Sequence, residues 1–280
     1  MLILESPWTR QPQTVAQPNL RSELLSGAAL FMPFNGHTQD LISGKLATLG
    51  AGASTSVDLM GRALYGSGSA AVASIPVNLS SVGIVSVSFW LYWPAYANDY
   101  DMALEYTADG GANAGFYISP NAASGNWQFA ASSTAGGPYT DMARYSAGLH
   151  HYAININRNK DANAGAFEAF VDGESASLFA ASGSARAGNF DNSTLYILSR
   201  NNASLFGNGS IRNLVVRPGV ALTQRQAKSE YRNPWQLFAP QQIYIPTAAA
   251  TGYTHPTLSA ATALEIGATS FKPSVTYTFA

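Results

Sequence analysis

The stretch AFEAFVDGES (Ala166–Ser175) decides the fold class, because it reads either as an acidic cluster or as the tip of a hairpin. Phe167, Ala169 and Val171 share one face under the two-residue period of a β-strand. Asp-Gly at the end of the strand is a strong hairpin signal, because Gly173 accepts a positive φ angle at no steric cost. A strand and a tight turn therefore explain the stretch, and its acidic residues need no catalytic role.

Other short segments repeat this pattern. SVSFWLYW (residues 86–93) and HHYAININ (residues 150–157) place apolar side chains at every second position. Gly-, Asn- and Asp-rich turns separate the segments. Regular short strands predict an all-β antiparallel sandwich of the jelly-roll type. The further predicted strands are residues 29–34, 62–68, 102–107, 115–120, 126–132, 167–173, 194–199 and 209–219.

One helix is expected, in LTQRQAKSEYRNP (residues 222–234). Thr223 can cap its first turn, good helix formers fill residues 224–232, and Pro234 ends it.

The ends of the chain have a different character. Residues 1–26 contain three prolines and the isolated Trp8, which predicts an extended N-terminal arm. Residues 27–238 form the predicted sandwich, and residues 239–280 form a Pro-punctuated β tail. Its last segment, SVTYTFA, is too apolar to remain unpaired in water. It must join the sandwich edge, form a small module, or pair with another chain.

The composition narrows the function classes. Charged residues make up 11% of the 280 residues and the net charge is −1, which disfavours nucleic acid as a partner. Cysteine is absent, which excludes disulfides, thiolate metal sites and thiol nucleophiles. Neither a signal peptide in MLILESPWTR nor a membrane-spanning segment of about 20 apolar residues is expected. The neutral, small-residue surface suits contacts with other chains.

Four motifs resemble the laminin G-like, concanavalin A-type jelly roll of bacterial and phage proteins. They are VSVSFWLYWPA, GLHHYAININRN, FEAFVDGES and FGNGSIRNLVVRPGVALTQRQAKSEYRNP. They occur in the order of that family and cover roughly residues 28–233, with Leu149 where the family usually has Trp.

The ends, SPWTRQPQ and NPWQLFAP, resemble tailed-phage virion proteins that carry this jelly roll. The resemblance implies a virion component, made in the host cytoplasm and attached to capsid or tail subunits. We expect a homo-oligomer whose terminal segments fasten it to its partners. The expected interface residues are Trp8, Trp235, Val275, Tyr277 and Phe279.

Catalytic chemistry has weaker candidates. Asp99, Asp101 and Glu105 fall on one face of a strand, but their spacing departs from the E-x-D-x-x-E and E-x-D-x-E motifs of glycosidases of this shape. His150 and His151 are adjacent on a strand and point to opposite faces, and no serine lies in a G-x-S-x-G elbow. We therefore predict that the protein is not an enzyme and has no catalytic residue.

Ligand binding is the alternative function. Tyr96, Tyr100, Trp127 and Tyr139 lie near predicted loops or strand ends and could stack on host surface glycans. No cofactor is expected. The family resemblance allows a Ca²⁺ ion on a rim loop, although ordinary turn formation explains the same residues. The candidate ligands are Asp161, Asn163, Asp191 and Asn192. The main hypothesis is thus a non-enzymatic virion protein of capsid-decoration type; a tail-associated carbohydrate-binding adhesin comes second and a glycosidase third.

Overall fold

The computed structural model describes residues 2–6, 9–12, 16–58, 60–94, 101–106, 114–120, 125–131 and 137–245. The chain divides into two compact units. In the smaller unit, β1 (Leu2–Ser6) pairs antiparallel with β18 (Gln241–Ile245). The larger unit spans Pro7–Pro240 and contains the sandwich.

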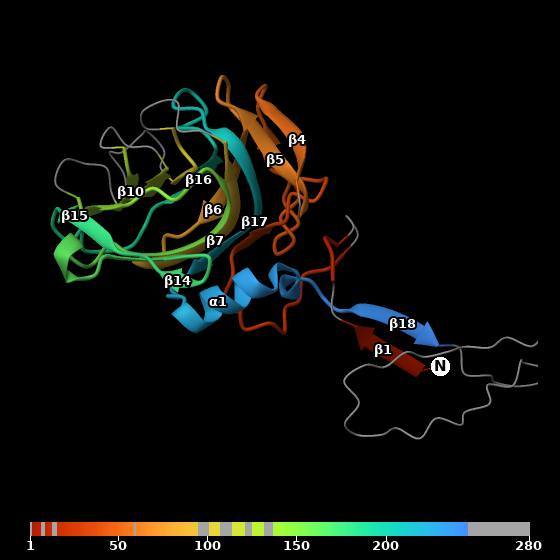
Figure 1. The fold of residues 1–280 in the computed structure, drawn as a ribbon. Coiled ribbons are helices and arrows are strands. Elements are labelled where there is room, and N and C mark those ends of the chain that lie inside the picture. The colour runs from red at the N-terminus through yellow and green to blue at the C-terminus, as the bar shows by residue number, and fades with distance from the viewer. Residues whose placement is uncertain are drawn as a thin grey trace, which may run out of the picture. The chain divides into compact units, whose positions relative to one another are not determined.

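Two eight-stranded antiparallel sheets form the sandwich (Figure 1). The first sheet has the order β15-β11-β10-β9-β8-β16-β6-β3; the second has the order β14-β13-β12-β7-β17-β5-β4, with β2 also paired to β17. The strands of the first sheet are β3 (Thr48–Leu49), β6 (Ala73–Asn78), β8 (Leu104–Tyr106), β9 (Phe116–Ser119), β10 (Trp127–Ala131), β11 (Tyr139–Met142), β15 (Leu178–Ser182) and β16 (Asn192–Ile197). Those of the second are β2 (Leu30–Met32), β4 (Ala53–Asp58), β5 (Gly61–Ser67), β7 (Ile84–Trp93), β12 (Gly148–Asn157), β13 (Phe167–Val171), β14 (Glu174–Ser175) and β17 (Asn208–Pro218). The predicted antiparallel sandwich is therefore confirmed.

The core lies between the two sheets and follows from the two-residue period. In β7, Phe89 and the residues at every second position from it face inward, where they join one continuous apolar cluster. Phe89 stacks on Tyr152 of β12 at 5.7 Å between ring centroids. Tyr152 in turn stacks at 4.2 Å on Trp127, which comes from the first sheet. These rings connect the two sheets through the centre of the sandwich.

The stretch AFEAFVDGES forms a tight hairpin, as the sequence predicts. Asp172 and Gly173 both have positive φ angles, 51° and 79°, between β13 and β14. A side chain at residue 173 would place its Cβ 2.7 Å from the Cα of Lys228, because a helix crosses the turn here. Glycine is therefore required for the turn and also for the packing of the helix.

Strand β17 contains a bulge at Asn213. Its pairing with β7 shifts register between Arg212 and Val215, and Asn213 has a φ of 48°. On its other side, β17 pairs with β5 before the bulge and with β2 after it. The bulge marks the point where the strand exchanges one neighbour for another.

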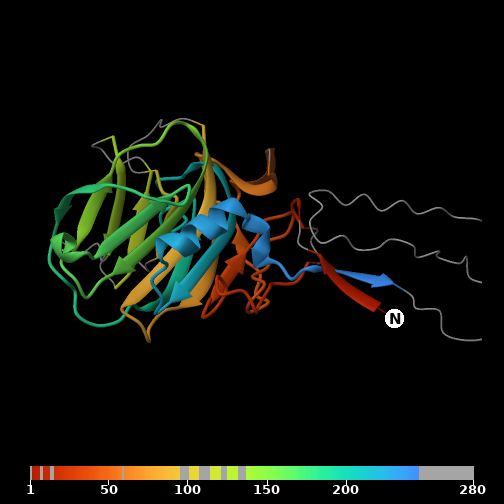
Figure 2. The same ribbon diagram turned by 60° about the horizontal axis from the view of Figure 1, so that its bottom comes forward.

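Helix α1 (Gln224–Arg232) lies against the outer face of the second sheet (Figure 2). Thr223 and Gln226 form a capping box, with hydrogen bonds of 3.3 Å and 2.9 Å between the side chain of each and the backbone N–H of the other. A short 3₁₀ helix, η2 (Pro234–Leu237), begins at Pro234. The predicted cap and the predicted end of the helix are both confirmed.

A buried charge cluster fixes α1 to the sheet. Arg217 of β17 donates to Glu230 at 3.0 Å, to Ser88 at 2.8 Å and to the carbonyl oxygen of Leu24 at 2.5 Å. Ser88 also donates to Glu230 at 2.7 Å, and His151 Nε2 lies 3.8 Å from the same carboxylate oxygen. Burial alone would raise the pKa of Glu230, but the charge of Arg217 and the contacts with His151 and Ser88 outweigh it and lower the pKa from 4.5 to about 2.

Residues 16–26 differ from the extended arm that the prolines of the N-terminal region predict. Asn19 N–H donates to Leu237 O, and Ala239 N–H donates to Gln17 O, each at 2.8 Å. Leu24 and Leu25 are buried in a cluster with Trp235 of η2 and Phe238, which follows η2. Residues 16–26 therefore pack on the sandwich, because the burial of these leucines outweighs the local preference for an extended chain.

Among the sandwich strands in the described ranges, β3, β4, β6, β11 and β15 lie where the sequence analysis assigned none. Strand β4 consists mainly of small polar residues, so no apolar period marks it. Strand β6 contains Pro76, but its neighbour β3 pairs only with residues 73 and 74, so the missing N–H of Pro76 interrupts no pairing with β3. No helix in the described ranges is long and apolar enough to cross a bilayer.

We expect Glu230→Gln to lower the free energy of unfolding by about 3–5 kcal/mol, because it leaves Arg217 buried without a counter-charge. The folded pKa of Glu230 lies below its unfolded value, so its stabilisation is complete above pH 4.5 and declines as the pH falls towards about 2. Urea unfolding at several pH values measures both effects.

Glu23→Gln is the matched control. Its exposed ion pair with Arg225 spans 3.8 Å and contributes at most about 1 kcal/mol. Equal losses of stability in the two variants would contradict a structural role for the buried cluster.

Candidate functional site

A set of side chains on the outer face of the first sheet forms the candidate site. Because alternate residues face the core, Glu105 and Gln128 project outward from β8 and β10. The register sets Glu105 opposite Tyr117, and Gln128 opposite Asp141, which itself lies opposite Phe179. We call this set the polar–aromatic face; it consists of Glu105, Tyr117, Gln128, Tyr139, Asp141, Phe179 and Tyr196.

Hydrogen bonds hold the polar members of the face in place. Tyr117 Oη donates to Gln128 Oε1 at 2.6 Å, and Gln128 Nε2 donates to Asp141 Oδ1 at 3.1 Å. Arg200 Nε donates to Glu105 Oε1 at 2.9 Å, and its guanidinium lies 5.9 Å from the centre of the Tyr117 ring. These links join four neighbouring strands of the sheet into one pre-arranged network.

Burial divides the face into a base and a rim. Glu105 has no exposed surface and Asp141 is buried, whereas Tyr139 is 38% exposed and Phe179 is 42% exposed. The carboxylates therefore lie at the base, and the aromatic rings stand out at one end. Such a surface offers a ligand stacking area together with oriented hydrogen-bonding groups.

The predicted glycan-stacking residues differ in their exposure. Tyr139 is exposed on the polar–aromatic face. The prediction for Trp127 is wrong, because its side chain is completely buried and stacks on Tyr152 in the core. Its position next to a turn suggested exposure, but its place in the two-residue period directs it inward. Tyr96 and Tyr100 lie outside the described residues.

Sequence reasoning missed most of the face. Gln128 could have been found, since it lies between two core residues of a predicted strand. Phe179 could not, because LFAAS has no polar alternation. Arg200 lies after β16 and meets Glu105 only through the order of the strands in the sheet.

Among the predicted interface residues, the structure describes Trp235 alone; Trp8, Val275, Tyr277 and Phe279 lie outside the described residues. Trp235 is largely buried and packs 6.4 Å from Phe238. It therefore has a partner within its own chain, and its role in an interface stays a prediction.

The proposed carboxylate trio does not form an open acid–base pair among the described residues. Asp99 lies outside them, Asp101 is buried, and Glu105 is held by Arg200. A glycosidase needs two carboxyl groups that both reach the substrate. The described carboxylates therefore fit a supporting role better than a catalytic one.

Ser146, His150 and Asp172 have the order of a nucleophile, a base and an orienting acid. His150 Nδ1 lies 2.7 Å from Asp172 Oδ2, and Ser146 Oγ lies 3.5 Å from His150 Nε2. The carbonyl oxygen of Ser146 is nearer to Nε2, at 3.1 Å, and it can only accept a hydrogen bond. A protonated Nε2 that satisfies this contact cannot take the hydroxyl proton, so the trio fits a structural role. His151 faces the opposite side of the strand, with its ring 5.3 Å from that of Trp90.

The described residues contain no group of three or more His, Cys, Asp or Glu side chains arranged to hold a metal ion. Two of the loop residues considered for calcium make local bonds instead. Asp161 accepts from the backbone N–H of Ala185 at 2.6 Å, and Asp191 accepts from that of Ala114 at 2.8 Å.

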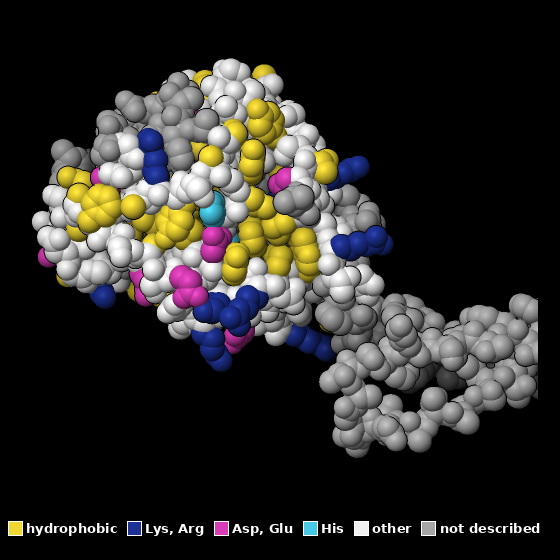
Figure 3. Space-filling model, in the orientation of Figure 1, with side chains coloured by type: hydrophobic (Ala, Val, Ile, Leu, Met, Phe, Trp, Pro, Cys, Tyr) yellow, Lys and Arg dark blue, Asp and Glu magenta, His cyan; other side chains and the backbone are white. Residues whose placement is uncertain are grey.

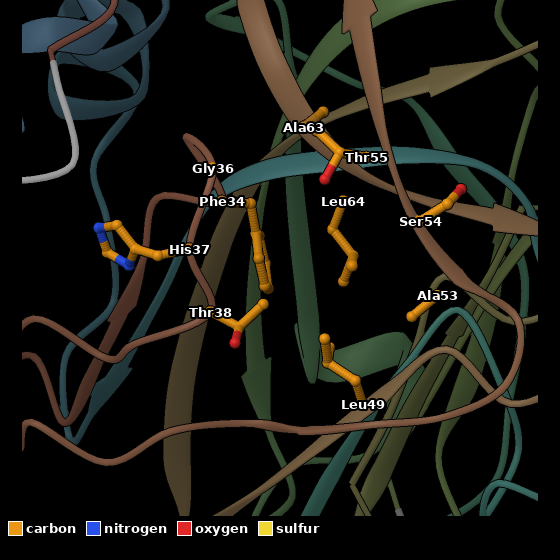
Figure 4. A pocket seen from close by; sticks show the side chains of 10 residues that line it. All are labelled: Phe34, Gly36, His37, Thr38, Leu49, Ala53, Ser54, Thr55, Ala63 and Leu64. Atoms are coloured by element: carbon orange, nitrogen blue, oxygen red, sulfur yellow. The ribbon is translucent and has the colours of Figure 1, made fainter.

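A cavity of about 280 Å³ opens at the edge of the sandwich, between β3, β4 and β5 (Figure 4). Phe34, Leu49 and Leu64 converge in it, while His37 points away from them. Phe34 and Leu64 also belong to the core, and Thr38, Ser54 and Thr55 add polar groups to the lining.

Comparison with known proteins identifies the fold but no family. No protein-family model matches the chain, and no curated protein sequence matches it. Domain 4 of AbnA, a GH43 extracellular arabinanase from Geobacillus stearothermophilus whose structure contains arabinotriose, is similar in structure. The match has a TM-score of 0.54 and 17% identity, and covers 72% of this chain and 97% of that domain.

Two longer proteins share the same architecture. The binding domain of Paraclostridial Mosquitocidal Protein 1 matches with a TM-score of 0.54 and 16% identity, over 75% of this chain and 52% of that one. Trypanosoma rangeli sialidase, in a complex with 2,3-difluorosialic acid, matches with a TM-score of 0.55 and 12% identity, over 81% of this chain and 36% of that one. The chain thus spans about half of the first protein and about a third of the second. At these identities the matches establish a β-sandwich fold.

The contrast between Trp127 and Tyr139 can be measured. We expect Trp127→Ala to lower the free energy of unfolding by about 3–5 kcal/mol, because it opens a cavity in the core. Tyr139→Ala should change it by less than about 0.5–1 kcal/mol, because the ring is partly exposed. Chemical denaturation of both variants provides the test, and similar costs would contradict the placement of the two rings.

Proposed function

We propose that this chain is a non-catalytic glycan-binding module whose ligand lies on the polar–aromatic face. The observation that carries the proposal is the pairing of exposed aromatic rings with a hydrogen-bonded row of polar side chains on one sheet face. The chain shares its β-sandwich fold with an arabinanase domain seen with arabinotriose and with a toxin binding domain. This likeness supports the proposal at the level of fold alone.

The chemistry of a sugar matches the two parts of the face. A pyranose or furanose ring has apolar C–H surfaces, which pack on aromatic rings such as Tyr139 and Phe179. Its hydroxyl groups donate and accept hydrogen bonds, as do the amide of Gln128 and the phenol of Tyr117. Because the network already orients these polar groups, little side-chain entropy is lost on binding.

Binding rather than hydrolysis follows from the state of the carboxylates. Glu105 is completely buried and engaged by Arg200, and Asp141 receives a hydrogen bond from Gln128. Neither is open to act as an acid or a nucleophile on a glycosidic bond. A carbohydrate held here would leave unchanged.

A glycan array followed by calorimetry on the best ligand tests this function. We expect saturable binding that Tyr139→Ala weakens about tenfold or more, the loss expected when one stacking contact is removed. Tyr92→Ala is the matched control, because Tyr92 is also 38% exposed but lies on the second sheet.

Two results would count against the proposal: an array without a reproducible ligand, or equal losses in Tyr139→Ala and Tyr92→Ala. Release of reducing sugar by the intact protein would show that the face is catalytic.

A second candidate function is attachment to other subunits through the terminal segments. The observation that favours it is that β1 and β18 pair in a unit of their own, in which the described residues include no third strand. Such a two-stranded sheet has unpaired edges and a strand from another chain could extend it. The virion role implied by the sequence resemblance stays a prediction of this kind.

Deletion of residues 1–6 together with 241–280 tests attachment, because the sandwich unit spans Pro7–Pro240. We expect the full chain to sediment as an oligomer and the shortened chain as a monomer with an unchanged melting temperature. An identical oligomeric state in both would exclude fastening through the termini.

A further inference from the structure

A second cavity lies on the outer face of the other sheet. It has a volume of about 330 Å³, at the lower end of the range of about 300–1,000 Å³ for small-molecule sites. Two indole rings, those of Trp90 and Trp235, border it. In Figure 3, hydrophobic side chains gather above α1, over β7 and β17, on this side of the molecule. The lining residues are Thr9, Arg10, Gln11, Met60, Trp90, Pro234 and Trp235.

The wall formed by residues 9–11 is fastened to the sandwich. Gln11 Nε2 donates to Arg62 O, and Arg62 N–H donates to Gln11 Oε1, each at 2.7 Å. Gly61 makes room for this contact, since a Cβ there would lie 2.1 Å from Gln11 Oε1. The cavity is therefore preformed, as binding sites for small molecules usually are.

Two side chains that line the cavity, Trp90 and Arg10, offer hydrogen-bond donors and no acceptor. Trp90 Nε1–H is buried and has no acceptor, and the exposed guanidinium of Arg10 has no ion pair among the described residues. Outside the cavity lining, Arg212 lies opposite Trp90 on the neighbouring strand and leaves its Nη1 without a hydrogen bond. Asp58 is already engaged by Arg212 and by the N–H of Met60. The environment is thus donor-rich and cationic between aromatic rings.

We propose that this cavity binds a carboxylate-bearing sugar ring, such as a uronic acid unit. The parts of the Trp90 and Trp235 rings that face the cavity, 8% and 9% exposed, contact the apolar surface of the sugar ring, and Arg10 pairs with the carboxylate. A ligand oxygen beside Trp90 supplies the acceptor that its N–H lacks. This site is separate from the polar–aromatic face, and it does not depend on the function proposed for that face.

Titration of the full chain with D-glucuronate and D-galacturonate tests the proposal, with intrinsic tryptophan fluorescence and ligand-observed NMR as readouts. We expect saturable binding of at least one uronate. D-glucose and D-galactose lack the carboxylate, and acetate lacks the ring. Each should bind at least about tenfold more weakly than the uronate.

Arg10→Ala should weaken uronate binding about tenfold or more, whereas Arg21→Ala, an exposed arginine in the same N-terminal region but outside the cavity lining, should leave it unchanged. Trp90→Phe keeps an aromatic ring but removes the N–H, and should weaken binding while the protein stays folded by its melting temperature. Tyr139→Ala should have no effect, which separates this site from the polar–aromatic face.

Absence of saturable binding by both uronates would overturn the proposal, as would equal effects of Arg10→Ala and Arg21→Ala. Loss of uronate binding in Tyr139→Ala with retention in Arg10→Ala would assign the ligand to the first sheet instead.

Discussion

Strand β7 is buried on both faces, and most of the architecture follows from that constraint. Its inner face packs into the core between the two sheets, while Ser88 and Trp90 on its outer face lie beneath α1 and its flanking segments. An outer sheet face with a buried arginine cannot be covered by apolar residues alone, because an unpaired buried charge is strongly destabilising. Glu230 meets that requirement, and it sets the position at which α1 lies on the sheet. We infer that the ion pair contributes more to the position of α1 on the sheet than to the free energy with which α1 packs there.

The two sheets consequently have different surfaces available for function. Helix α1, η2 and residues 16–26 cover much of the second sheet, which leaves the cavity beside Trp90 at their margin. The outer face of the first sheet keeps its half-exposed aromatic rings together with a polar network. A protein built in this way acts through surfaces that are already arranged before a ligand arrives. Its carboxylates serve as hydrogen-bond acceptors and counter-charges, which is consistent with recognition.

The sequence patterns predicted the structure best where the deciding interactions lie within a few residues of one another. The alternation in β7 and β12, the Asp-Gly turn and the cap at Thr223 are local features, and each appears where it was predicted. Strand β4 was missed because its residues are small and polar on both faces. Residues 16–26 were misread because the prolines of this region are a local signal, whereas the burial of Leu24 and Leu25 depends on aromatic residues about 200 positions later.

The amino-acid sequence by itself determined the all-β class, the longest strands and the capped helix α1, because periodicity and turn chemistry act within a few residues. Only the tertiary structure decided which outward-facing side chains meet. Glu105, Gln128 and Asp141 come from strands whose order in the sheet no local pattern encodes.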